Sequence, residues 1–276
     1  MRKLEGTMLT THADLDGERM APKGLDSFAA SVNENYLPFT VEHDIRKAPI
    51  GRVASAAVVP LADGEFAVRG VFEVFEEGDT LSSLRGDGRR IRVDRNDVST
   101  FYVKCDRSYE TAEGREFLAA LRRLSPDSHV TLQVKKSADP ISTLFIAAGV
   151  FVGTSIAAGF FARLGEDLYV SLKRLLKTHF GCHSEQRERL LVFQFTTAVG
   201  ADLAEVQVVL TNPTPEEIDA LFLRGFSDLD SYLSRCAGLD SAARFVFEYK
   251  DGRLESLYVL RSDCVPLRLR RVPDSN

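Results

Sequence analysis

The alternation of apolar and polar residues divides the chain into three segments. The first, residues 1–139, has the short alternating runs of a β-rich domain. Residues 51–60 and 66–75 are separated by an Asp-Gly turn, which predicts two antiparallel strands. Apolar residues at helical spacing predict amphipathic helices over residues 22–32 and 111–124. The first segment should therefore combine paired strands with helices.

The second segment, residues 140–183, begins with the strongest signal in the sequence. No charged residue occurs over the 23 positions 140–162. A bilayer core of about 30 Å needs roughly 20 apolar residues in a helix, so this run predicts a transmembrane helix, and residues 164–180 predict an amphipathic helix after it. A central apolar helix wrapped by soluble domains is the alternative. We therefore expect a single-pass membrane protein, or otherwise a cytoplasmic one.

Two glycines within the uncharged run predict contact between copies of the chain. Gly149 and Gly153 are four positions apart, and small residues at this spacing let two membrane helices approach closely. We therefore expect a homo-oligomer formed through this helix.

The third segment, residues 184–276, alternates in the manner of a small α+β domain. Residues 190–195 and 203–211 predict strands, and a helix is expected to begin at Thr214, a good N-cap followed by proline. Two further alternating runs, joined by an Asp-Gly turn, predict a hairpin. The segment is expected to have the order ββαββ, and the whole chain to belong to the α+β class.

Composition narrows the choice of function. The chain has 276 residues, of which 44% are hydrophobic, and a net charge of −5, which argues against a disordered chain and against a nucleic-acid binder. The four cysteines form no close pair and are expected to be reduced. His179, Cys182 and His183 could bind a metal but have no second cluster beside them. We expect neither a metal nor a cofactor.

The first residue that suggests chemistry is His43. It stands in the sequence PFTVEHD, followed closely by PIGR, which ends at Arg52. The pKa of a free histidine is near 6.5, so an imidazole beside a carboxylate such as Asp44 is suited to general-base catalysis. A single histidine beside an acid is more often a surface or structural residue, and His43 gains weight only from its surroundings.

Those surroundings resemble the phage prohead (capsid maturation) proteases, which are serine peptidases with a β-barrel like that of herpesvirus assemblin. The resemblance is carried by DLDGERMAPKGLDSF at 14–28, LPFTVEHD at 37–44, PIGRV at 49–53 and DGE at 63–65. It implies a β-barrel-like N-terminal domain with His43 as a catalytic residue. Glu42 stands where the family usually has asparagine. The resemblance does not extend to the uncharged run or the C-terminal segment.

The resemblance also implies a serine nucleophile on a strand downstream of the histidine. Ser99, in DVSTFY, lies on a predicted strand at a suitable separation, although the small residue and glycine that usually follow are missing. Ser108 is a second candidate and Ser55 a poorer one. A strand serine without a catalytic role is the alternative interpretation of Ser99.

Together these residues define a mechanism and two functional hypotheses. Ser99 would attack a peptide carbonyl and His43 would take its proton, while Asp44, Asp14 or His12 would orient the imidazole. The first hypothesis is a membrane-tethered, phage-related serine endopeptidase, a hydrolase that cleaves itself or a protein partner. The second is a non-catalytic, membrane-anchored sensor or interaction protein that uses the protease-like barrel to recognise a protein or peptide.

Overall fold

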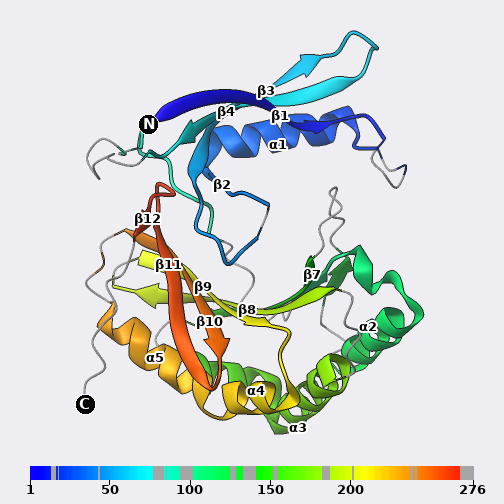
Figure 1. The fold of residues 1–276 in the computed structure, drawn as a ribbon, viewed down its shortest axis with the longest axis vertical. Helices are drawn as coiled ribbons and strands as arrows, with labels where there is room; N and C mark the ends of the chain where they lie inside the picture. The colour runs from blue at the N-terminus through cyan, green and yellow to red at the C-terminus, as the bar shows by residue number, and fades with distance from the viewer. Residues whose placement is uncertain are drawn as a thin grey trace. The chain divides into compact units, whose positions relative to one another are not determined.

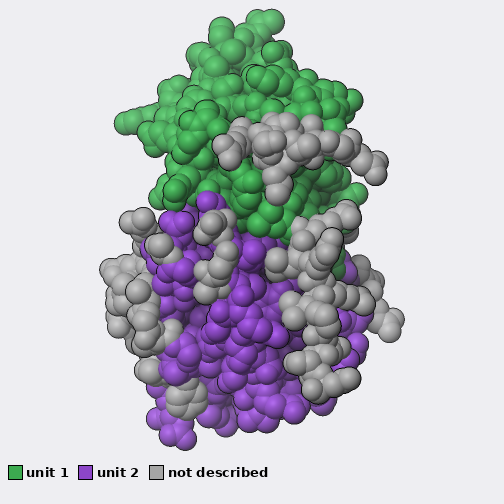
Figure 2. All heavy atoms as spheres, turned by 90° about the vertical axis from the view of Figure 1, so that its left-hand side faces the viewer, with its two compact units in different colours: residues 1–92, 260–276 green, residues 93–259 purple. Residues whose placement is uncertain are grey.

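A computed structural model describes the chain except for a set of short segments. These segments are residues 14–16, 18, 43, 77–83, 85, 94–101, 125–128, 133–140, 152–154, 182–186, 201, 237–238, 240 and 268–276. The described residues form two compact units. Unit 1 comprises Met1–Arg92 and Leu260–Asn276, and unit 2 comprises Val93–Val259 (Figure 2).

Unit 1 contains a four-stranded antiparallel sheet and one helix (Figure 1). Its elements are β1 (Arg2–Thr10), α1 (Pro22–Glu34), β2 (Leu37–Phe39), β3 (Gly51–Pro60) and β4 (Phe66–Val74). The strand order is β1-β4-β3-β2. The predictions of antiparallel strands over residues 51–60 and 66–75, and of a helix at 22–32, are confirmed.

The expected β-barrel-like domain is wrong, because the described strands of unit 1 form an open sheet with β1 and β2 at its two ends. The apolar face of this sheet is covered by α1 instead of by closure on itself. Leu25 and Val32 of the helix pack with Val53 of β3 and Val68 of β4. A helix over one face buries these side chains without requiring further strands.

Most of an eight-stranded sheet and the remaining helices belong to unit 2. The strands are β5 (Tyr102–Cys105), β6 (His129–Leu132), β7 (Ile141–Phe151), β8 (Glu188–Val199), β9 (Asp202–Thr211), β10 (Ala242–Lys250), β11 (Arg253–Arg261) and β12 (Pro266–Leu267). Their order is β12-β11-β10-β9-β8-β7-β5-β6. The helices are η1 (Arg107–Glu110), α2 (Ala112–Leu124), α3 (Ile156–Gly181), α4 (Pro215–Ala220), η2 (Leu221–Gly225) and α5 (Phe226–Arg235).

One face of this sheet is covered by helices (Figure 1). Phe193 and Phe195 of β8 both contact Phe160 of α3 and Phe226 of α5, with ring centroids 5.4–6.1 Å apart. Because successive side chains on a strand point to opposite faces, the even-numbered residues of β8 lie on the other face. That face carries polar residues, among them Gln194 of β8 and Gln207 of β9.

The predicted transmembrane helix is wrong, because the uncharged run folds as two elements. Ile141–Phe151 is strand β7, and α3 begins at Ile156. The strand lies between β5 and β8, with Leu144 buried on one face and Ala147 on the other. A strand buried on both faces is nearly continuous in apolar residues and carries no charge. Among the described residues no helix is long and apolar enough to cross a membrane. The single-pass localisation is therefore not supported.

The predicted helix contact through Gly149 and Gly153 fails for the same reason. Gly149 lies in β7, and Gly153 is outside the described residues. The amphipathic helix expected at 164–180 is present as part of α3, which is kinked at Gly165. The other helix predicted from the pattern, at 111–124, is present as α2.

The third segment has the predicted order of elements: β8 and β9, then helical turns, then β10 and β11. Thr214 caps α4 by accepting from the backbone N–H of Glu217, whose side chain accepts from the backbone N–H of Thr214. A turn of π-helix, η2, separates α4 from α5 and was not expected. The chain is α+β, as predicted, but the long apolar helix is not found among its described residues.

Candidate functional site

Three of the predicted catalytic and orienting residues, His43, Ser99 and Asp14, lie outside the described residues. Asp44 and His12, the other two, are described in unit 1. Their contacts show what each side chain does in the structure.

Asp44 fixes the loop that carries position 43. Its Oδ1 accepts hydrogen bonds from the backbone N–H and Nε of Arg46 at 3.0 and 2.9 Å, and its Oδ2 accepts from Nη2 at 2.9 Å. Burial raises the pKa of Asp44, but the hydrogen bonds from Arg46 outweigh burial and lower that pKa below its ordinary value. The carboxylate predicted to orient His43 is thus bound by an arginine of its own loop.

Further contacts close the loop formed by residues 40–50. The backbone N–H of Ile50 donates to the carbonyl of Phe39 at 2.9 Å, and Lys47 forms an ion pair with Glu42. Glu42 has a φ of 61°, a left-handed conformation that is uncommon outside glycine. The loop is therefore held in one shape immediately before position 43, and Val41 and Ile50 are both exposed on it.

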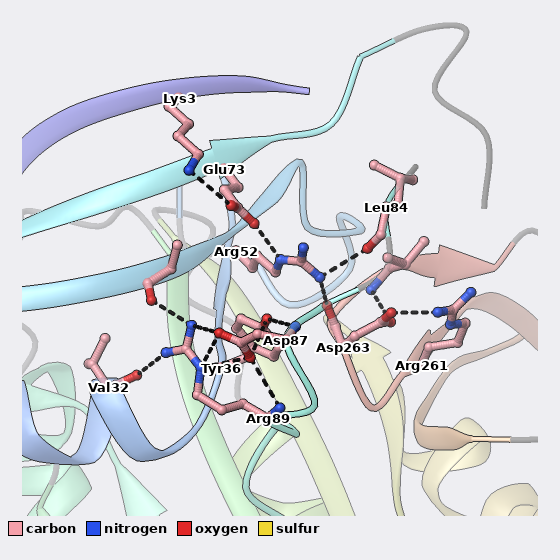
Figure 3. Close-up of polar contacts among 12 residues, drawn as sticks. Lys3, Val32, Tyr36, Arg52, Glu73, Leu84, Asp87, Arg89, Arg261 and Asp263 are labelled. Atoms are coloured by element: carbon pink, nitrogen blue, oxygen red, sulfur yellow. Dashed lines mark hydrogen bonds and ion pairs between the residues drawn. The ribbon is translucent and has the colours of Figure 1, made fainter. Parts of the chain in front are cut away.

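Two residues of the PIGR sequence, Gly51 and Arg52, hold neighbouring segments of unit 1 together, and we call their contacts the structural joint of unit 1. A Cβ at Gly51 would lie 2.2 Å from the carbonyl oxygen of Glu73, so only glycine fits where β3 pairs with the end of β4. The next side chain, Arg52, is 2% exposed. Its Nε donates to Glu73 Oε2 at 2.8 Å, and its Nη1 donates to the carbonyls of Leu84 and Asp263 at 3.1 and 3.0 Å (Figure 3).

A tyrosine completes this joint. The guanidinium carbons of Arg52 and Arg89 lie 4.6 and 4.5 Å from the ring centroid of Tyr36, and the Tyr36 hydroxyl donates to Asp87 at 2.8 Å (Figure 3). Hydrogen bonds from Arg89 hold the pKa of Asp87 well below its usual range. In this structure Gly51 and Arg52 of the PIGR sequence connect strands and loops, so their role is structural.

His12 pairs with a carboxylate of a neighbouring turn. Its Nε2 lies 2.6 Å from Asp63 Oδ2, in the turn between β3 and β4, and both side chains are exposed. The hydrogen bond from His12 lowers the pKa of Asp63. The structure thus brings together the imidazole of His12 and the carboxylate of Asp63, a pair that the sequence analysis did not predict.

The alternative nucleophiles lie in different surroundings. Ser55 is exposed on β3. Ser108 lies in η1 of unit 2, where its Oγ contacts Asp106 Oδ1 and the Oγ of Ser142. Asp106 also accepts from the backbone N–H groups of Ser108 and Thr143 at 2.9 and 2.6 Å. Its carboxylate therefore caps η1 and ties this turn to β7.

Near this turn, His179 of α3 is buried and uncharged. Its ring stacks on that of Phe117, with the ring centroids 3.9 Å apart, and contacts the ring of Tyr109 at a centroid distance of 5.4 Å. Burial lowers the pKa of His179 to about 3, with a smaller contribution from the charge of Arg189. Cys182 and His183, its neighbours in the sequence, are outside the described residues, and the described side chains include no group of three or more suited to a metal.

A polar group that the sequence analysis did not single out lies on strands β8, β9 and β10. Gln194 stands opposite Gln207, and Arg244 stands beside Glu205. The available signal was the presence of polar residues at alternate positions in apolar strands. Their grouping depends on the order and register of three strands, which the sequence pattern does not supply.

No family model, curated protein or solved structure matches this chain. Function is therefore inferred from the chain's own residues.

Proposed function

We propose that unit 1 binds a segment of a protein partner at the loop formed by residues 40–50. The observation that carries the proposal is that Val41 and Ile50 are 44% and 39% exposed on a loop held in one shape by its own hydrogen bonds. Large apolar side chains exposed on one loop favour an interaction surface. A loop already fixed in shape loses little conformational entropy on binding.

The residues around these side chains indicate the chemistry of the partner. Leu37 of β2, which leads into the loop, is a third large apolar residue with more than a third of its surface exposed. Glu42 and Lys47 add one charge of each sign. This combination suits a peptide segment with a large apolar side chain and polar neighbours. Binding at this site does not require catalysis or a membrane.

Peptide cleavage at the same loop is a second candidate function. It is favoured by the left-handed backbone of Glu42, because strained residues concentrate at active sites, and by the resemblance of this loop to the prohead proteases. In that mechanism His43 would take a proton from Ser99 as the serine oxygen attacks the peptide carbonyl. Asp44 would contribute by fixing the loop through Arg46.

A peptide-array experiment tests recognition. The full chain is incubated with an array of random twelve-residue peptides, and the double variant Val41→Lys, Ile50→Lys is compared with the natural chain. We expect the natural chain to retain peptides enriched in large apolar residues and the variant to lose at least about tenfold in affinity. Phe66→Lys, at an exposed apolar residue of β4, is the matched control. Equal retention by the double variant, or no retained peptide, would refute the proposal.

The same peptides test cleavage. Mass spectrometry of the supernatant detects cut products, and His43→Ala and Ser99→Ala are compared with Ser231→Ala, an exposed serine of α5 that is not a candidate nucleophile. Cleavage that disappears in the first two variants and persists in the third supports a peptidase. Cleavage that survives His43→Ala, or an absence of any cut product, rejects the peptidase and leaves recognition to be judged by retention alone.

A further inference from the structure

Strand β1 forms one edge of the sheet of unit 1. Among the described strands it pairs with β4 alone, and β2 forms the other edge. Residues 2–5 of β1 are exposed, and its register against β4 shifts between Thr7 and Leu9. An edge strand presents a row of backbone N–H and C=O groups with which a further strand can pair. The regular part of this edge is therefore residues 2–7.

Lys3 and Glu5 are residues of this edge whose backbone groups point outward. The N–H of Phe75, directly after β4, donates at 2.8 Å to the carbonyl of Ile50, which directly precedes β3. Because backbone groups alternate between the two sides of a strand, the even-numbered residues of β4 turn theirs toward β1, where they stand opposite even-numbered residues. The odd-numbered Lys3 and Glu5 therefore turn their N–H and C=O groups to the outer edge.

The side chains of this edge end a row of alternating charges. Arg52 of β3, Glu73 of β4 and Lys3 of β1 stand opposite one another across three strands. Arg52 Nε donates to Glu73 Oε2 at 2.8 Å, and Lys3 Nζ lies 3.8 Å from Glu73 Oε1 (Figure 3). The side chain of Lys3, at the end of the row, is 68% exposed. An anion opposite Lys3 on an added strand would continue the row, since opposite charges across strands attract.

A second copy of β1 supplies that anion in one register. In an antiparallel pair of β1 strands centred on Leu4, Lys3 of each copy stands opposite Glu5 of the other, and their backbone groups face each other. A pair centred on Lys3 or on Glu5 places like charges opposite each other instead, which is unfavourable. Leu4, which is 40% exposed, meets Leu4 of the other copy.

We propose that two copies of this chain associate through β1 in the register centred on Leu4, which joins their two four-stranded sheets into one. The contact is self-complementary, as a two-fold symmetric dimer requires. Charged side chains exclude most other strands from a sheet edge, and those of β1 match a second copy of the same strand.

Charge reversals test this register on the full chain. Sedimentation equilibrium gives the dissociation constant of the dimer. Lys3→Glu places only acids opposite each other and Glu5→Lys only lysines, so each variant alone should dimerise at least about tenfold more weakly than the natural chain. An equimolar mixture of the two variants should recover most of this loss, because each chain then faces opposite charges.

Recovery in the mixture separates the contact between copies from effects within one chain. Lys3→Glu also changes the contact with Glu73 of its own chain, and mixing does not restore that contact. Circular dichroism checks that both variants fold. A natural chain that stays monomeric at its highest soluble concentration, variants that dimerise as tightly as it does, or a mixture no better than either variant would overturn the proposal.

A disulfide experiment locates the centre of the pair. At a non-hydrogen-bonded position the two Cα atoms lie about 4.5 Å apart, so Leu4→Cys should form a cross-linked dimer on mild oxidation. Thr7→Cys is the matched control, because Thr7 is exposed on the same strand and its two copies would lie about 20 Å apart. Both variants also carry Cys182→Ser, since the other three cysteines are buried. Equal cross-linking of the two variants rejects this register.

Discussion

Replacing Arg52 by methionine is expected to destabilise unit 1 severely. Methionine has a similar length but carries no charge and no donor. The substitution removes the ion pair between Arg52 and Glu73. Among the described residues, the ion pair that Glu73 then keeps is with Lys3, whose Nζ lies 3.8 Å away and whose side chain is exposed. It also removes the guanidinium donor from the carbonyls of Leu84 and Asp263.

The magnitude follows from these contacts. Removing one partner of a buried ion pair costs about 3–5 kcal/mol, mostly because the other charge stays buried. Glu73 keeps 12% of its side chain exposed and retains Lys3, which reduces the cost of its uncompensated charge. Each buried carbonyl that loses its donor adds about 1 kcal/mol or more to the loss of stability. We expect Arg52→Met to lower the free energy of unfolding of unit 1 by about 3–5 kcal/mol.

Urea denaturation followed by circular dichroism measures this loss. Arg69→Met is the matched control, because Arg69 is an exposed arginine on neighbouring β4. The double variant Arg52→Met, Glu73→Gln should recover part of the stability, since it removes the uncompensated charge. If Arg52→Met unfolds at the same urea concentration as Arg69→Met, the assignment of Arg52 as the structural joint of unit 1 is wrong.

Three further predictions concern single positions. Gly51→Ala should destabilise unit 1 more than Gly64→Ala, because a Cβ at Gly51 meets the Glu73 carbonyl. A Cβ at Gly64 meets no atom within 4 Å, so that substitution costs only about 1 kcal/mol in backbone strain. Urea denaturation compares the two variants. Because the pKa of His179 is lowered in the folded chain, its contribution to stability is complete above pH 6.5 and is progressively lost toward pH 3. The free energy of unfolding of His179→Phe should therefore depend less on pH over that range. An unchanged pH dependence would contradict this. Thr214→Ala should cost about 1 kcal/mol by removing the cap of α4, seen as a lower melting temperature.

The sequence pattern predicted most elements but misassigned the uncharged run. An apolar run has no periodicity that separates a buried strand and a following helix from one long helix. A local signal was present: Ser155 accepts from the backbone N–H of Ala158, as an N-cap serine does. The first N–H groups of α3 also bind Asp230 of α5, a contact between distant residues that local pattern does not contain.

The candidate sites were less predictable than the strands. Arginine is usually exposed, so no local pattern predicts that Arg52 is buried. Likewise, Gln194 and Glu205 look like ordinary polar positions until the register of β8 and β9 places them on one face. The segment around His43 is singled out as a candidate site by its motif. The hydrogen bonds between Asp44 and Arg46, however, depend on the backbone conformation of residues 44–46, which residue types alone do not predict.

Unit 1 is assembled from both ends of the described chain: the carbonyls of Ser262 and Asp263 accept from Ile91 and Arg52. During synthesis on the ribosome, the N-terminal strands therefore emerge long before the residues that complete their hydrogen bonds. Unit 2 lies between the two parts and is finished earlier. A nascent chain stalled before Ser262 would expose a partly formed unit 1 to proteases and chaperones.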